Sequence, residues 1–177
     1  MFKLKVAFIF IVFLNISTSY ASNIKNSAVI FMYHKFGISK YPTTSITINQ
    51  LDSHIKEFAK EKYSIKSLEY IMDTIINDGD LPKNTIGISV DDADKSFFDV
   101  GWPLFKSHSI PVTLFVTTGT IANNNKSYLN WDQIRKLKEE GVTIGAHSHT
   151  HAHMPDIDIT EVKNEIELSN KIFLREL

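Results

Sequence analysis

The chain has 177 residues, of which 43% are hydrophobic, enough for one domain with a substantial core. Its formal net charge is −1, and no basic stretch is interleaved with aromatic residues, so the composition excludes an electrostatic nucleic-acid partner and favours a neutral or weakly charged substrate. Cysteine is absent, which excludes disulfides and thiolate ligands. Any metal site must therefore use nitrogen and oxygen ligands.

The first 21 residues have the layout of a secretory signal peptide. Lys3 and Lys5 precede an apolar run over residues 6–14, and a small and polar stretch leads to Ala21. The apolar run is well short of the ~20 residues that a membrane-spanning helix needs, which favours a cleaved signal over a membrane anchor. We expect cleavage at about Ala21, no stable membrane span afterwards, and a mature domain over 22–177 that is secreted or lies in the periplasm or cell envelope.

Apolar runs of strand length then alternate with helical patterns. Residues 28–33 form a continuous run rich in β-branched and aromatic side chains, which predicts a strand buried on both faces. Thr47 and Ser67 are the predicted N-caps of two helices, the second running from Leu68 to Gly79. The predicted inward residues are Leu51, Ile55, Phe58 and Ala59 in the first helix and Ile71, Met72, Ile75 and Ile76 in the second.

The second half continues the alternation. Predicted strands cover residues 86–90, 112–116 and 142–146, and Pro103 should kink or shorten the helix between the first two. A capping-box pattern at Asn130 and Gln133 opens another helix, which stops at Gly141. The last predicted helix is capped by Thr160 and turns one face inward: Val162, Ile166, Ser169 and Phe173.

This order predicts one α/β domain with a parallel sheet or barrel and right-handed crossovers. In such folds the carboxyl ends of the strands share one edge, where active sites are built. His34, the pair Asp91-Asp92, and His147 each follow a predicted strand. We therefore expect these side chains to converge on one rim.

The two aspartates suit metal-dependent hydrolysis. Taken alone, such a pair more often caps a helix or builds a turn. At the carboxyl end of a strand, however, one carboxylate can bind a divalent ion while its neighbour acts as general base toward water at that ion.

Four histidines alternate over residues 147–153, and their spacing leaves several arrangements open. On an extended strand all four would point to one face, whereas a helical turn would pair His147 with His151 and His149 with His153. The alternation is also compatible with a loose metal-scavenging patch or a solvated loop.

The segments Ser89-Val90-Asp91-Asp92-Ala93 and His147-Ser148-His149-Thr150-His151 resemble the first two motifs of the polysaccharide deacetylases, also called NodB-homology or carbohydrate esterase family 4 proteins. Those motifs are typically Thr-Phe-Asp-Asp-Gly and His-Ser/Thr-x-x-His. Further similarity in Met32-Tyr33-His34, in residues 96–116 and in residues 130–147 extends the resemblance to about residues 28–176.

The resemblance implies hydrolysis of N-acetyl groups on an aminosugar polysaccharide, with release of acetate. It implies that Asp91 is the general base and that Asp92, His147 and His151 bind a divalent metal. A two-histidine, one-aspartate set suits Zn, with Co, Ni or Mn compatible. His34 and Ser148 are expected to line the site, although His34 is equally compatible with a hydrogen-bonded structural histidine. His149 and His153 are expected to lie outside the ligand set.

The chain departs from the family pattern in two respects. Ala93 replaces the usual Gly, which predicts a backbone without a positive φ there. The family's later motifs, which supply an Arg, a Tyr-bearing loop for the oxyanion and a general-acid His, have no counterpart in these 177 residues. The expected fold is therefore an incomplete (β/α) barrel of the NodB/glycoside hydrolase-deacetylase type, with its C-terminal strands missing.

Two other functions compete with that of an active deacetylase. One is a catalytically silent metal- or glycan-binding fragment, whose barrel a downstream chain would complete, and the other is a histidine-patch metal scavenger. The resemblance leaves peptidoglycan, poly-N-acetylglucosamine and chitin-type substrates open.

Overall fold

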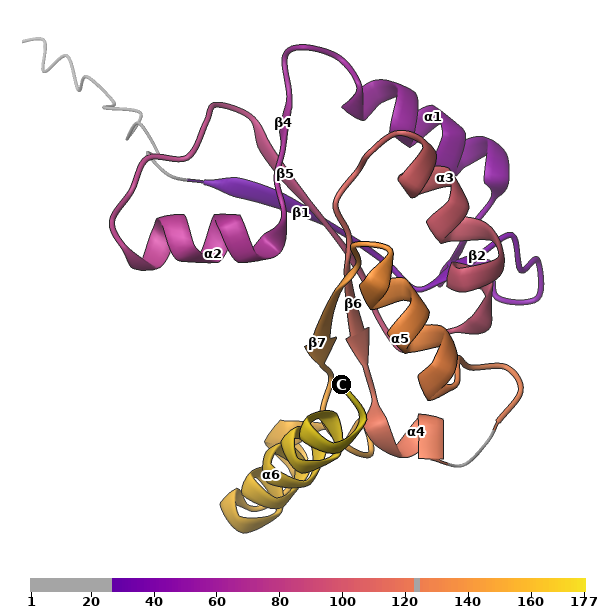
Figure 1. Cartoon of the computed structure of the whole chain (residues 1–177), viewed down its shortest axis with the longest axis vertical. Helices are drawn as coiled ribbons and strands as arrows, with labels where there is room; N and C mark the ends of the chain where they lie inside the picture. Colours follow the sequence, from indigo (N-terminus) through magenta and orange to yellow (C-terminus); the bar gives the residue numbers. More distant parts are fainter. Residues whose placement is uncertain (1–26, 123–124) are drawn as a thin grey trace, which may run out of the picture.

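A parallel sheet organises the computed structural model, which describes residues 27–122 and 125–177. Its neighbouring strands, in spatial order, are β1 (Ala28–Tyr33), β5 (Thr85–Val90), β6 (Thr113–Val116) and β7 (Thr143–Ala146) (Figure 1). Because β1 pairs along the whole of β5, the short β4 (Ser64–Ile65) and β6 share the other side of that strand, at its start and its end. The four predicted strands are confirmed to within a residue at either end.

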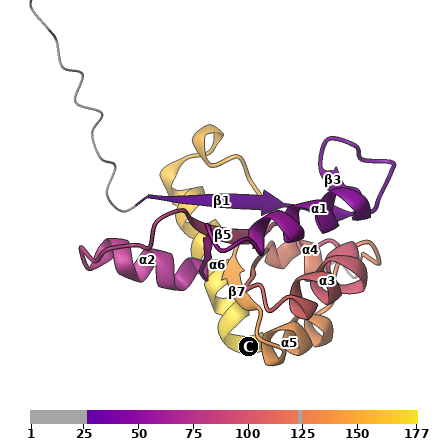
Figure 2. The same ribbon diagram turned by 90° about the horizontal axis from the view of Figure 1, so that it is seen from above.

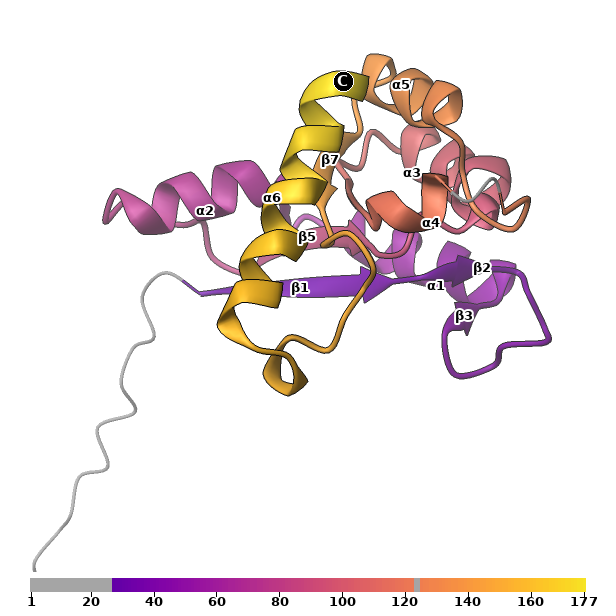
Figure 3. The same cartoon turned by 90° about the horizontal axis from the view of Figure 1, so that it is seen from below.

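Six α-helices, one π-helical turn, one 3₁₀ turn and a two-stranded sheet complete the described residues. These elements are β2 (Lys35–Phe36), β3 (Ser45–Ile46), α1 (Ile48–Phe58), α2 (Leu68–Ile76), η1 (Phe97–Gly101), α3 (Trp102–Ser107), α4 (Thr118–Ala122), α5 (Trp131–Glu139), η2 (Met154–Asp156) and α6 (Ile159–Glu176). In Figure 1, α1, α3 and α5 lie on one side of the sheet. Figure 3 shows α6 alongside β7.

Local capping chemistry sets several of these helix starts. The Thr47 side chain accepts a hydrogen bond from the Gln50 amide in a full capping box, and Asn130 does the same with Gln133. Ser67 caps α2 as predicted. The π-helical turn η1 precedes α3, so Pro103 lies in the first turn of α3, where its missing N–H is not needed.

The predicted cap of the last helix is wrong. The N-cap of α6 is Asp158, whose carboxylate accepts hydrogen bonds from the amides of Thr160 (2.7 Å) and Glu161 (2.9 Å). A carboxylate at this position satisfies two free amides and interacts favourably with the helix dipole, so it prevails over the hydroxyl of Thr160. The predicted inward face is also displaced, because Ile166 is exposed and Ile172 is buried.

The hydrophobic core lies between the sheet and the helices α1, α3 and α5. All six residues of β5 are buried, as expected of a central strand, and the largest fully buried side chains include Phe36, Phe97 and Phe105. The ring of Phe31 on β1 packs edge-on against Phe58 of α1 at a centroid distance of 4.9 Å. This contact packs α1 against β1.

Two predicted burial patterns are wrong. Strand β1 lies at the edge of the described sheet (Figure 2) and exposes Val29 (59%) and Met32 (60%), so it is not buried on both faces. Helix α2 buries Ile71 alone of its four predicted inward residues, leaving Met72, Ile75 and Ile76 exposed. Met72 and Ile76 each follow an inward position by one residue, about 100° around the helix, so they point away from the contact of α2 with β5.

Within residues 27–122 and 125–177, no helix is both long and apolar enough to cross a membrane. The predicted signal peptide lies outside the described residues.

Candidate metal centre

The first part of the site is a strained turn directly after β5. The Asp91 amide donates to the carbonyl of Tyr33 (2.9 Å), which continues the β1–β5 ladder. Asp92 and Ala93 then both have positive φ, 71° and 56°. The prediction that Ala93 needs no positive φ is therefore wrong. Left-handed backbone costs about 1–2 kcal/mol per non-glycine residue, so the surrounding structure must hold it.

Tertiary hydrogen bonds hold this turn in place. The Leu129 amide donates to the carbonyl of Ala93 (2.9 Å), and the Lys95 amide donates to that of Ser127 (2.9 Å). Ala93 is also completely buried. The turn is thereby fixed against a segment about 35 residues further along the chain, which local sequence does not reveal.

The second part is the turn that follows β7. The His147 amide donates to the carbonyl of Val116 at the end of β6 (3.0 Å), and the Ser148 hydroxyl oxygen accepts from the His151 amide (3.0 Å). Ser148 and His151 both have positive φ, 59° and 62°. The turn places the Nε2 atoms of His147 and His151 3.1 Å apart. Of the open arrangements, the structure thus shows the His147–His151 pairing.

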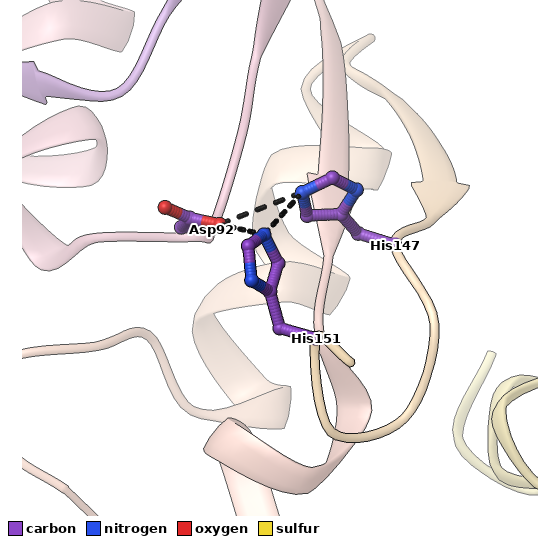
Figure 4. Close-up of side chains that lie close together, drawn as sticks. All are labelled: Asp92, His147 and His151. Carbon is purple, nitrogen blue, oxygen red and sulfur yellow. Dashed lines mark hydrogen bonds and ion pairs between the residues drawn. The ribbon is translucent and has the colours of Figure 1, made fainter. Parts of the chain in front are cut away.

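These two turns bring three candidate ligands together (Figure 4). Oδ1 of Asp92 lies 3.5 Å from Nε2 of both His147 and His151. Tetrahedral coordination with bonds of about 2.0–2.1 Å places neighbouring ligand atoms about 3.3 Å apart. The observed separations match that spacing, and the three side chains form a group that could hold a divalent ion.

The two other histidines of the alternation have different partners. The Nδ1 atom of His149 lies 2.9 Å from the Thr118 hydroxyl, and that of His153 lies 2.8 Å from a carboxylate oxygen of Asp156. Neither belongs to the group of three side chains that could hold a metal ion.

Asp91 lies beside this group in a different environment. Its side chain is buried, and among the described residues its Oδ1 atom has no hydrogen-bond partner. Burial raises the pKa of the Asp91 carboxyl, and the nearby His147 partly opposes this. An unpaired, desolvated carboxylate is suited to accept a proton.

The predicted lining residues have separate positions. His34 follows β1 and lines a hollow of about 280 Å³ together with Gln50 and His54. Ser148, in contrast, uses its hydroxyl oxygen inside the histidine turn. The structure therefore gives Ser148 a role in shaping the turn.

Sequence reasoning missed Glu165, a residue of α6 that holds the histidine turn from outside. Its carboxylate accepts hydrogen bonds from the amides of His149 (2.9 Å) and Thr150 (2.7 Å) and from the Thr150 hydroxyl (2.8 Å). Burial alone would raise the pKa of Glu165, but these hydrogen bonds lower it overall. No local motif marks this contact, because its partners are 15 or 16 residues away.

A close backbone approach holds the other side of the turn. The Gly119 amide at α4 donates to the carbonyl of His149 (2.8 Å), and the Thr118 amide donates to that of Ser148 (3.3 Å). A Cβ atom on Gly119 would lie only 2.6 Å from the carbonyl oxygen of His149, so glycine is required at this position.

Residues 78–175 match the family described as polysaccharide deacetylase. The chain belongs to the polysaccharide deacetylase family. The matched region includes all three candidate ligands and Asp91, so the resemblance of the two motifs is confirmed at the level of the family.

Curated relatives include poly-beta-1,6-N-acetyl-D-glucosamine N-deacetylases of two staphylococci. The Staphylococcus aureus protein is 26% identical over 132 residues, covering 75% of this chain and 44% of the relative. The Staphylococcus epidermidis protein is 28% identical over 151 residues, covering 72% and 49%. The chain thus spans less than half the length of these relatives.

Solved deacetylases share the fold. The Streptococcus pyogenes deacetylase PplD, in complex with acetate, superposes with a TM-score of 0.77 at 19% identity, covering 87% of this chain and 70% of that one. IcaB from Ammonifex degensii gives a TM-score of 0.60 at 21% identity, covering 70% and 54%. These superpositions confirm the predicted fold class, and the chain matches only part of each structure.

Proposed function

We propose that this chain carries the metal-binding and general-base part of a polysaccharide N-deacetylase. The convergence of Asp92, His147 and His151 beside the unpaired carboxylate of Asp91 is the observation that carries the proposal. The names of the curated relatives support poly-β-1,6-linked N-acetylglucosamine as the substrate class.

Asp92, His147 and His151 would hold the divalent ion, and their two imidazoles and one carboxylate suit Zn, with Co, Ni or Mn also compatible. When bound, the ion supplies a Lewis acid that polarises an amide carbonyl and makes a neighbouring water more acidic.

The protein's own acid–base step falls to Asp91. Its carboxylate accepts the proton of the water that adds to the amide carbon, and its buried position favours holding that proton. The carbon–nitrogen bond then breaks, the acetyl group leaves with the hydroxyl of the water as acetic acid, and the sugar nitrogen takes up the proton that Asp91 accepted, to become an amine. Each atom of the added water is thereby accounted for in the acetate and amine products.

A second possibility rests on uncovered apolar side chains. Val29 and Met32 on β1 and Leu174 on α6 are exposed, and Leu174 is 88% exposed. An apolar sheet edge of this kind suits another segment or chain that pairs with it. Such a segment would complete the barrel and supply the acid and oxyanion groups implied by the resemblance. Without it, the chain would be a metal- or glycan-binding unit with no turnover.

The test is acetate release from β-1,6-linked N-acetylglucosamine oligomers by the chelator-treated chain, with and without added Zn. Asp92→Ala should abolish release, whereas Asp156→Ala removes an exposed carboxylate outside the three-ligand group and should not. Release that survives both chelation and Asp92→Ala would refute the proposal. Release that requires the C-terminal part of the Staphylococcus epidermidis relative would support the two-part arrangement.

We also propose that the protein works outside the cytoplasm. The signal-peptide pattern that ends at Ala21 supports this proposal. Determining the N-terminal residue of the exported protein tests it.

A further inference from the structure

A second hollow, of about 570 Å³, lies between the segment that follows β1 and the segment that follows β5. Two tyrosine rings and four charged side chains contribute to its lining, and we call it the tyrosine hollow: Lys35, Tyr41, Asp94, Lys95, Asp99 and Tyr128. Its volume falls within the range of small-molecule sites, about 300–1,000 Å³.

The tyrosine hollow shares the rim with the candidate metal centre. Asp94 is two residues after Asp92 and forms an antiparallel bridge with Tyr128. The same bridge region fixes the strained backbone of Ala93 through the Leu129 amide. Two residues span at most about 7 Å of backbone. The tyrosine hollow is thus close beside a chain-like ligand whose reacting unit lies at Asp92.

The charges of the tyrosine hollow cancel. The Lys35 ammonium lies 4.0 Å from an Asp94 carboxylate oxygen, and both side chains are largely buried. Lys95 forms an ion pair with Asp99. Two cations and two anions leave a lining of no net charge, which favours a neutral ligand over a phosphate or an acidic polymer.

The tyrosines add flat apolar faces that end in hydroxyl groups. Tyr41 is 42% exposed, although the Lys35 and Lys40 ammonium groups lie 5.4 Å and 5.2 Å from its ring centroid. Tyrosine rings supply amphipathic contact area, and the negative face of the ring attracts weakly positive C–H groups. A pyranose ring presents C–H faces, which match the tyrosine ring, and hydroxyl edges, which match the tyrosine hydroxyl.

We propose that the tyrosine hollow binds a neutral N-acetylated sugar unit next to the unit whose acetyl group faces the metal centre. This inference rests on the proposed function and adds to it a subsite for the polymer, with Tyr41 and Tyr128 as its main contacts.

The test is calorimetric binding of a β-1,6-linked N-acetylglucosamine tetramer to the full chain with Zn present. Tyr41→Ala and Tyr128→Ala should each weaken binding by about fivefold or more, the effect of truncating a residue that contributes measurably to an interface. Tyr41→Phe keeps the ring and should bind the tetramer nearly as well as the wild type. Tyr70→Ala is the matched control, since Tyr70 on α2 is also 42% exposed and also lies near a lysine, Lys66 at 5.2 Å.

Acetate release, measured on the same variants, separates this inference from the proposed function. Tetramer binding that depends on Tyr41 but yields no acetate, even after the C-terminal part of the Staphylococcus epidermidis relative is added, would support the subsite and refute the deacetylase. Acetate release with unchanged tetramer affinity in Tyr41→Ala would overturn the subsite alone, as would a wild-type chain that binds no tetramer. If Tyr128→Ala fails to fold, the exposed Tyr41 decides the outcome.

Discussion

Replacing Glu165 by Ala should weaken zinc binding although Glu165 is not a candidate ligand. The substitution removes three hydrogen-bond acceptor contacts to the turn that carries His147 and His151. Hydrogen bonds to a charged group contribute about 1.5–3 kcal/mol each when well buried. Thr150 is exposed and His149 is half-buried, so water can replace much of this stabilisation.

We therefore expect a net loss of about 1.5–2.5 kcal/mol in the free energy that holds the turn. If most of this loss falls on metal binding, the dissociation constant for Zn should rise by about 10- to 50-fold, since 1.4 kcal/mol corresponds to about tenfold. Residues that orient metal ligands typically have effects of about 10- to 100-fold, which agrees with this magnitude.

Isothermal titration of the chelator-treated chain with Zn measures the effect. Glu165→Gln should give an intermediate affinity, because its amide oxygen can still accept from a backbone amide while the charge is lost. Glu167→Ala is the matched control, since Glu167 is an exposed glutamate of the same helix. Wild-type zinc affinity in a folded Glu165→Ala chain would refute the idea that α6 positions the histidine turn.

Three further predictions concern the ligands, the base and export. One tight Zn site should be lost in Asp92→Ala and in His151→Ala but retained in His153→Ala, and calorimetric loss in the His153 variant would contradict the ligand set. In a complete, active context, Asp91→Asn should keep zinc affinity while lowering the rate of acetate release by about 100-fold, because a general base is not a ligand. An equal loss of binding and rate would mean that the two carboxylates are misassigned. Mass spectrometry of exported protein should find Ser22 at the N-terminus, and material beginning at Met1 and retained in the membrane would favour an anchor.

The elements that sequence predicted best are those fixed by local chemistry. The capping boxes at Thr47 and Asn130 begin α1 and α5 where expected, because the capping partner is only three residues away. Burial was predicted less well, since it depends on which element lies opposite. The apolar run of β1 is compatible with a central strand, yet in the described sheet β1 is an edge. Hydrophobic periodicity shows which face of an element is apolar and does not show what covers it.

In the candidate site, too, one part could be predicted from the sequence and another could not. That Asp92 and His147 lie on one rim follows from the alternation of strands and helices, because each residue comes directly after a parallel strand. The alternation does not predict that the side chains of Asp92 and His147 come into contact. Asp92 follows β5 and His147 follows β7, and β6 lies between these strands. At a spacing of about 4.8 Å per strand, the two strand ends are about 10 Å apart.

Across that gap, both turns leave the ordinary path of the backbone. Four residues with positive φ do so, Asp92 and Ala93 on one side and Ser148 and His151 on the other, and none of them is glycine. Such strain persists only where tertiary contacts impose it, and here the amides of Leu129 and Gly119 and the carboxylate of Glu165 provide those contacts. The strained backbone and the three convergent ligand atoms thus have a common cause, which explains why Ala93 was misjudged and Glu165 overlooked at the one place where the chemistry is proposed to occur.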